Sequence, residues 1–293
     1  MVRETTSADP KNEQLHLINI RLTNAFHLDK LICISSQLKH VKTSSCFTPG
    51  PSGVSIKEQN SYCFLLIPSA EEKTSNLHIQ QRTEEICKDI AIVTVLVHSI
   101  DEVNQALQNG SSFFTSIYQK GILLYDHAEQ NFVEPGEGQS ISKRIQKRER
   151  YWEKFHQLSI QFAMGARFYA EKELNTLAVF MLHQAVQHSY SGTLKVMTGY
   201  KSNSNSLTRL VRLIETALPD STFVLSRQTA EENRLTNLLL KGFSDARYLD
   251  KFTVSQEEIQ KLLNRVSHII QEANSSCQDH LKQLKEGKIP YKK

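Results

Sequence analysis

The sequence predicts a mixed α/β domain followed by an all-α helical bundle. Short apolar runs of strand length alternate with helical patterns in the first half, and long segments with apolar residues at helical spacing fill the second half. A polar stretch that contains Pro-Gly separates the two patterns. A chain of 293 residues is long enough for two domains with separate cores. We therefore expect a domain over 1–126, a linker over 127–140 and a second domain over 141–293.

Four strands are expected in the first half, over the apolar runs at 31–34, 62–67, 90–97 and 121–125. Helical patterns cover 76–88 and 113–119. Ser99 and Glu102 have the spacing of a capping box, which begins a further helix that ends near Gly110. The segment 42–60 is rich in Ser, Pro, Gly and Lys, so we expect a long or partly disordered loop there.

Five helices are expected in the second half, at about 141–171, 173–200, 206–218, 230–248 and 255–286. Capping-box spacing at Thr229 and Glu232, and again at Ser255 and Glu258, marks the beginnings of the last two. Pro219 ends the third. Helices joined by short connections predict a bundle that runs mostly up and down.

The composition is that of an ordinary globular protein, with 39% apolar residues and a net charge of +4, which is too small to indicate nucleic-acid binding alone. No run approaches the roughly 18 apolar residues of a membrane span. The polar first residues are unlike a secretory signal, so we expect a cytoplasmic protein without membrane contact. Five cysteines without CxxC spacing are expected to be buried free thiols, and no motif indicates a metal or cofactor.

The segment 174–200 carries the most informative pattern. Its apolar residues have helical spacing, and small residues at Ala178, Ala185, Ser189 and Gly192 would let another backbone come close. A polar patch interrupts it at His183, Gln184, Gln187 and His188. Buried polar groups need partners, which here would be another protein element or a bound ligand.

Short motifs in the second half resemble those of a HEPN domain (higher eukaryotes and prokaryotes nucleotide-binding). They are Ala170-Glu171, the run 183–187, Leu207-x-x-Leu210 and the run 246–248. The first half looks like a degenerate form of the nucleotidyltransferase fold that often precedes such a domain. The segments that carry this resemblance are 32–47, 62–68 and 113–126.

A working nucleotidyltransferase of that type has a Gly-Ser turn after its first strand and two aspartates at i and i+2 on the next strand. That spacing puts both carboxylates on one face, where they hold Mg²⁺. Here the expected turn has Ser35 and Ser36, and the expected strand, 60–64, has no carboxylate. We therefore expect no metal-dependent nucleotidyl transfer. Ser35, Ser36, Ser44 and Ser45 are weaker candidates for phosphate contacts, although turn and loop capping explains such serines more simply.

The HEPN resemblance also implies a test for ribonuclease activity, since many members use an Arg-x(4–6)-His motif without metal. Arg21 with His27 and Arg150 with His156 fit the spacing, but chance placement gives about one or two such matches. The family motif lies near the fourth helix, where no histidine closely follows Arg247. We disfavour ribonuclease activity, while a composite dimer site that joins Arg247 to His183 or His188 remains open.

The remaining polar residues suit an anionic, planar ligand, because Arg binds phosphate, Tyr stacks and Gln reads a base edge. For any single one of these residues, a buried polar network or the centre of a dimer interface is the simpler explanation. These ligand-binding candidates are Arg167, His183, Gln184, Gln187, His188, Arg247 and Tyr248. A basic run at Lys143, Arg144, Lys147, Arg148 and Arg150 would contact RNA phosphates or form a solvated helix face.

Three functions follow from these patterns. The first is a non-catalytic, two-domain protein that binds a nucleotide or RNA, as a homodimer through its helical domain. The second is a metal-free HEPN ribonuclease of the toxin or defence type. The third is an interaction module that only dimerises, for which the small residues of 174–200 are the sequence signal.

Overall fold

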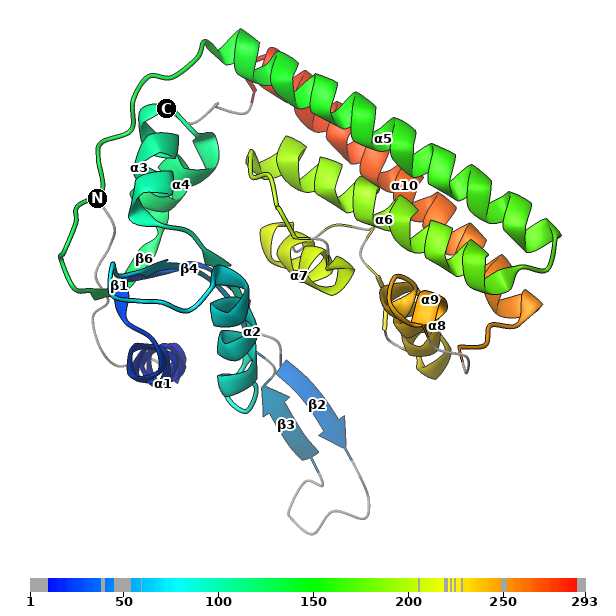
Figure 1. Cartoon of the computed structure of the whole chain (residues 1–293), viewed down its shortest axis with the longest axis horizontal. Coiled ribbons are helices and arrows are strands. Elements are labelled where there is room, and N and C mark those ends of the chain that lie inside the picture. The colour runs from blue at the N-terminus through cyan, green and yellow to red at the C-terminus, as the bar shows by residue number, and fades with distance from the viewer. Residues whose placement is uncertain are drawn as a thin grey trace. The chain divides into compact units, whose positions relative to one another are not determined.

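The computed structural model describes residues 10–37, 40–44, 54–58, 60–204, 206–218, 221, 223, 225–227, 229–248 and 252–288. Within these ranges the side chains of 10–12, 40–44, 54–58, 217 and 247–248 are not described. The chain divides into two compact units, one over residues 1–138 and the other over residues 139–291. We call them the α/β unit and the helical unit (Figure 1).

The α/β unit is built on a four-stranded sheet with the strand order β5-β4-β1-β6. Strand β1 pairs antiparallel with β4 and with β6, whereas β4 and β5 are parallel and are joined through helix α2. The sheet strands are β1 (Leu28–Gln37), β4 (Ser61–Pro68), β5 (Ile92–Val97) and β6 (Ile122–Asp126). The mixed α/β fold class predicted for the first half is therefore confirmed.

Helices cover both faces of this sheet (Figure 1). One face packs against α1 (Pro10–Ala25) and α2 (Asn76–Ile86), whose Leu15, Ile18 and Ile79 belong to the same buried cluster as Leu31 and Phe64. The opposite face is covered by α3 (Ile100–Gln108) and α4 (Ser112–Lys120). Because both faces are covered, β4 is buried along nearly its whole length, which explains its continuous apolar sequence.

The prediction of a long loop over 42–60 is wrong for the part that the structure describes. Strands β2 (His40–Ser44) and β3 (Val54–Glu58) pair antiparallel in a separate hairpin. Their alternation of polar and β-branched residues permits pairing even though the composition resembles that of a loop. Residues 45–53 and 59 lie outside the described residues.

Residues 127–138, which follow β6, are bonded to the α/β unit. The Glu129 amide donates to Asp29 Oδ1 at 3.1 Å, the Val133 amide to Asn104 Oδ1 at 3.0 Å and the Gly136 amide to the Leu107 carbonyl at 3.0 Å. Residues 127–138 thus pack with this unit as an extended strap.

The helical unit has three long helices and three shorter ones in its described part (Figure 1). Its central helix is α6, which packs against α5, α7, α8, α9 and α10. The elements are α5 (Ile141–Glu171), α6 (Asn175–Thr198), α7 (Leu207–Ala217), α8 (Ala230–Lys241), α9 (Asp245–Tyr248) and α10 (Gln256–Lys285). The helical fold class predicted for the second half is confirmed, and capping boxes begin α8 and α10.

The predicted helix over 230–248 is in fact two helices, because the chain turns at Gly242. A Cβ atom at Gly242 would lie 2.9 Å from Val179 Cγ1 and 3.1 Å from the Val179 carbonyl oxygen. The turn therefore lies against α6 at a position where a side chain would clash.

Four cysteines in the described residues are buried free thiols: Cys33, Cys63, Cys87 and Cys277. Within the described ranges, no three His, Cys, Asp or Glu side chains come together as metal ligands would. No helix in those ranges is both long enough and apolar enough to cross a membrane.

Candidate ligand pocket in the helical unit

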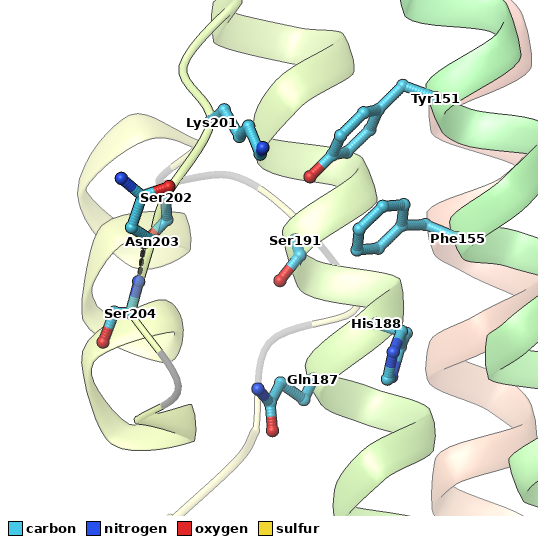
Figure 2. Close-up of a pocket in the computed structure, with 9 residues that line it drawn as sticks. All are labelled: Tyr151, Phe155, Gln187, His188, Ser191, Lys201, Ser202, Asn203 and Ser204. Carbon is cyan, nitrogen blue, oxygen red and sulfur yellow. Dashed lines mark hydrogen bonds between the residues drawn. The ribbon is translucent and has the colours of Figure 1, made fainter.

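A pocket of about 190 Å³ lies in the helical unit between α5, α6 and the segment that follows α6 (Figure 2). The two helices form its walls, and the segment 201–204 closes its third side. The lining residues are Tyr151, Phe155, Gln187, His188, Ser191, Lys201, Ser202, Asn203 and Ser204.

The wall from α5 is aromatic. Tyr151 and Phe155 are one helical turn apart, so they share a face of α5. Their rings stack with centroids 4.2 Å apart at 12°. Burial raises the pKa of the Tyr151 phenol above its ordinary value, so this group is a neutral donor at physiological pH. The wall offers a flat apolar surface with one hydroxyl beside it (Figure 2).

The wall from α6 is polar, and His188 is its most constrained side chain. His188 Nδ1 lies 2.7 Å from the Gln184 carbonyl oxygen. A carbonyl only accepts, so Nδ1 carries the proton, and Nε2 of the neutral ring is then an acceptor. The ring also stacks on Phe162, with centroids 5.1 Å apart, and lies near Phe155. Both the tautomer and the orientation of His188 are therefore fixed by the fold.

Gln187 lies on the same side of α6 as His188. Its Oε1 atom is buried. The Gln187 side chain also interacts with the His183 ring one turn earlier on α6, and this hydrogen bond raises the pKa of His183 against the larger lowering by burial.

The third side of the pocket begins where α6 ends. Gly199 adopts a left-handed conformation with φ 83°, which ends the helix, and the chain then runs back alongside α6 (Figure 2). The segment then holds itself folded, because Ser202 Oγ accepts from the Ser204 amide at 3.1 Å and Ser204 Oγ accepts from the Ser206 amide at 3.2 Å. Lys201 and Asn203 remain exposed at the rim, and the Lys201 side chain points towards Tyr151 (Figure 2).

The small residues of α6 set how closely α5 approaches it. A Cβ atom at Gly192 would lie 2.9 Å from Cε3 and 3.0 Å from Cζ3 of Trp152, and 3.1 Å from Cβ of Phe155. Ser159 Oγ donates to the Ala185 carbonyl at 2.7 Å further along the same contact. The close approach predicted for this stripe is present, and it positions the aromatic wall opposite the polar one.

The structure brings two of the seven predicted ligand-binding residues, Gln187 and His188, to this pocket. Gln184 does not line it, and only its backbone carbonyl bonds His188. Arg167 instead lies exposed on α5, where Nη2 donates to Ser267 Oγ at 3.1 Å. Arg247 and Tyr248 belong to α9, and their side chains lie outside the description.

His183 faces a different part of the bundle. Its Nδ1 lies 2.9 Å from the Leu239 carbonyl oxygen in the last turn of α8, and its ring lies near Phe243. Burial lowers the pKa of His183, so the ring is neutral and acts as a cap on α8. Five residues turn an α-helix by about 140° beyond a full turn, which explains why His183 and His188 face different neighbours.

The arginine–histidine pairs of the sequence do not assemble into a site. Arg21 lies in the α/β unit and makes a two-pronged ion pair with Asp89. Arg150 is exposed, and His156 stacks on Trp152 with ring centroids 5.1 Å apart. Neither His27 nor His156 lines the pocket.

Three of the four serines proposed as phosphate contacts in the first half lie in strands of the α/β unit. Ser35 and Ser36 lie within β1, opposite Cys63 and Tyr62 of β4, so the prediction that they form a turn is wrong. The strand simply continues past its apolar run. Ser44 ends β2 with an undescribed side chain, and Ser45 lies outside the described residues.

Sequence reasoning missed Tyr151, Phe155, Ser191 and the segment 201–204. Ser191 follows Gln187 by four residues, and Phe155 follows Tyr151 by four, so helical spacing alone could have extended each wall. The segment 201–204 was treated only as a connection between helices. Its Lys, Ser and Asn content after a glycine that ends a helix was the available signal.

Comparison with known families finds a similarity in the helical unit. The family description "HEPN domain" matches residues 158–276, which span the second half of α5 to most of α10. This match supports the HEPN domain predicted for that part of the chain. Among curated proteins no match was found.

Proposed function

We propose, with the HEPN domain of the helical unit as the premise, that this protein binds a nucleotide or RNA without catalysis, in the pocket between α5, α6 and residues 201–204. The observation that carries the proposal is the pairing of an aromatic stack with a set of polar side chains in one small pocket. Stacking on an aromatic ring contributes about 1–3 kcal/mol per base. Hydroxyl and amide groups then supply hydrogen bonds to base edges or phosphate oxygens.

The pocket is large enough to enclose only part of a nucleotide. Sites that enclose a drug-sized molecule have volumes of about 300–1,000 Å³, whereas this pocket has about 190 Å³. It suits one ring system, with the remainder of the ligand outside. Single-stranded RNA and free nucleotides both present a base in this way.

The α/β unit is proposed as a degenerate nucleotidyltransferase-like domain that does not transfer nucleotides. Its strand β4 has Ser61, Tyr62, Cys63 and Phe64 where paired carboxylates would hold Mg²⁺. Serine, cysteine and phenylalanine do not replace hard oxygen ligands for that ion.

The ribonuclease alternative would use His188, whose fixed tautomer suits proton transfer. It also needs a cation that stabilises the scissile phosphate, and the nine described lining residues include Lys201 but no arginine. An assay of RNA cleavage in EDTA decides this alternative. Cleavage that disappears in a His188→Ala variant would replace the binding function with a catalytic one.

The binding proposal is tested by titration calorimetry with adenosine, mononucleotides and a short single-stranded RNA. We expect Tyr151→Ala to weaken binding by about 1–3 kcal/mol, because it removes one of the two stacked rings. Tyr169→Ala is a matched control, since Tyr169 lies on the same helix and outside the pocket. Equal affinities for wild type and Tyr151→Ala would place the ligand elsewhere.

A second proposed role, homodimerisation, is favoured by an apolar surface on the helical unit. Four large side chains at the turn between α5 and α6 are 44–64% exposed: Met164, Phe168, Leu174 and Leu177. Adjacent exposed apolar side chains of this size are typical of contact surfaces. This surface makes a second copy of the chain the proposed partner.

Sedimentation equilibrium tests the dimer. Phe168→Glu replaces one of these four exposed apolar side chains with a charge, so we expect at least a tenfold weaker association, which is about 1.4 kcal/mol. Leu77→Glu is the control, because Leu77 is equally exposed on α2 of the α/β unit. A wild-type protein that stays monomeric at high micromolar concentration would contradict this role.

A further inference from the structure

On each of the two helices that line the pocket, a lysine lies one turn beyond the last lining residue. On α5, Lys147 precedes Tyr151 by four residues, and on α6, Lys195 follows Ser191 by four. Residues four apart share a helix face. The Arg148 guanidinium donates to the Val196 carbonyl at 2.6 Å, so the beginning of α5 lies beside the end of α6. The two lysines therefore belong to the same end of the groove.

Lys201 completes this group from the third side of the pocket. Lys147 and Lys201 are exposed, while Lys195 is half-buried. Lys195 Nζ donates to the Gly199 carbonyl at 2.7 Å, which uses one of its three donors. Two donors of Lys195 and the ammonium groups of Lys147 and Lys201 remain for an anion. We call Lys147, Lys195 and Lys201 the cationic mouth.

The positive charges of the cationic mouth are not neutralised by described acidic side chains. The pKa of Lys195 is lowered to about 8, first by burial and then by the charges of Arg148, Lys201 and Lys147. Every charged group that acts on Lys195 is thus a cation, two from α5 and one from the segment after α6. From α10, His280 faces Arg148, which contributes to lowering the pKa of His280. No described acid pairs with the three lysines of the mouth.

Helix capping explains only part of this arrangement. The carbonyl end of a helix attracts cations, and Arg148 and Lys195 each bond a carbonyl in the last turn of α6 or just beyond it. Lys147 and Lys201 make no such bond among the described residues, yet they add charge to the same place. An anion between the three ammonium groups would relieve their mutual repulsion.

We propose that the cationic mouth binds a phosphate group of the same ligand whose base stacks on Tyr151 and Phe155. This inference rests on the proposed function of the pocket. Lys147 and Lys195 lie one helical turn, about 5.4 Å, beyond the lining residues of their helices, and Lys201 is itself a lining residue. The phosphate and the base therefore belong to one extended ligand. A nucleoside 5′-polyphosphate and an RNA strand share this chemistry.

Calorimetry with four ligands separates the mouth from the pocket. Adenosine tests the pocket alone, pyrophosphate tests the mouth alone, and ATP and a short single-stranded RNA test both together. The variant is Lys147→Gln with Lys201→Gln, and the matched control is Lys88→Gln with Lys172→Gln, two exposed lysines outside the site. We expect the site variant to bind pyrophosphate, and ATP or RNA, at least tenfold more weakly. The single variant Lys147→Gln lies outside the pocket lining, so we expect it to leave adenosine binding unchanged.

The outcomes distinguish the two proposals. Suppose that adenosine binds, pyrophosphate does not, and ATP and RNA bind no more tightly than adenosine. This result would overturn the proposed phosphate site and keep the proposed base pocket. Pyrophosphate binding that depends on Lys147 and Lys201, without adenosine binding, would keep the mouth and overturn the pocket. Binding of neither would overturn both. Tighter binding of ATP than of RNA identifies a free nucleotide as the ligand, and the reverse identifies an RNA strand.

Proton uptake gives a second readout. The lowered pKa of Lys195 leaves a fraction of its side chains neutral near pH 8 in the free protein. A bound phosphate raises this pKa, so binding takes up protons, which titrations in buffers of different ionisation enthalpy detect. Lys195→Met should abolish the uptake. Uptake that persists in this variant would exclude Lys195 from the phosphate site.

Discussion

The two units differ in whether a lysine that is removed from solvent has a carboxylate as its partner. In the α/β unit, Lys30 is buried, and its ammonium donates to Asp126 at 2.6 Å and lies 3.7 Å from Asp29. In the described part of the helical unit, the charged groups that act on Lys195 are the cations Arg148, Lys201 and Lys147. A charge that is paired within the fold has little left for a ligand, whereas an unneutralised cluster favours an anion. The comparison teaches that buried charge indicates a binding site only where the protein does not supply the counter-charge.

The largest effect is expected when the ion pairs of Lys30 with Asp29 and Asp126 are removed. Lys30→Ala leaves the buried carboxylate of Asp29 and the carboxylate of Asp126 without their cation, so we expect the α/β unit to lose about 3 kcal/mol of unfolding free energy. Urea denaturation measures this loss. The control is Lys88→Ala, since Lys88 is exposed. An unchanged midpoint for Lys30→Ala would mean that the pairing contributes no net stability.

The next effect is expected in the packing that positions the pocket walls. Gly192→Ala puts a methyl group within 3.0 Å of the Trp152 ring, which should cost about 1–3 kcal/mol in urea denaturation. Gly165→Ala is the matched control on α5, because its nearest neighbour is Met181 Sδ at 3.8 Å. There we expect a gain of about 0.5–1 kcal/mol from the reduced entropy of the unfolded chain. Equal stabilities of the two variants would contradict the close approach of α5 and α6.

The smallest effect concerns pH. Burial lowers the pKa values of His156, His183 and His280 in the helical unit. The unfolded chain then binds more protons than the folded chain near and below pH 6.5, so stability is present above that value and is lost as the pH falls. Thermal unfolding between pH 7.5 and 5 measures the loss. In His183→Gln, which keeps a donor for the Leu239 carbonyl, we expect a weaker dependence, and an unchanged one would exclude His183 as a contributor.

The comparison also explains which parts of the fold the sequence predicts. Strand β4 and helix α6 were predicted closely, because burial on several sides leaves long apolar runs. Helix α1 was missed, since its apolar residues include the exposed Leu17 and Ile20 as well as the buried Ile18 and Leu22, which weakens its helical pattern. The hairpin of β2 and β3 was missed because polar strands resemble loops in composition.

The pocket was predicted only along α6, and the reason is geometric. Local spacing placed Gln187 and His188 on one side of a buried helix, but it could not say that His183 caps α8. The fold of 201–204 against the pocket depends on the left-handed Gly199 and on contacts distant in sequence. Single-sequence patterns report periodicity within an element and not which elements become neighbours.

The strap over residues 127–138 determines how the chain can be divided for study. A fragment that ends at Asp126 would leave the Asn104 side chain and the Leu107 carbonyl without their amide donors, and Lys30 without the Phe132 ring 5.7 Å from its ammonium. A fragment that ends at Gly138 keeps all of these contacts. The separately expressed α/β unit should therefore extend past its last strand by the full length of the strap, although no helix or strand lies there.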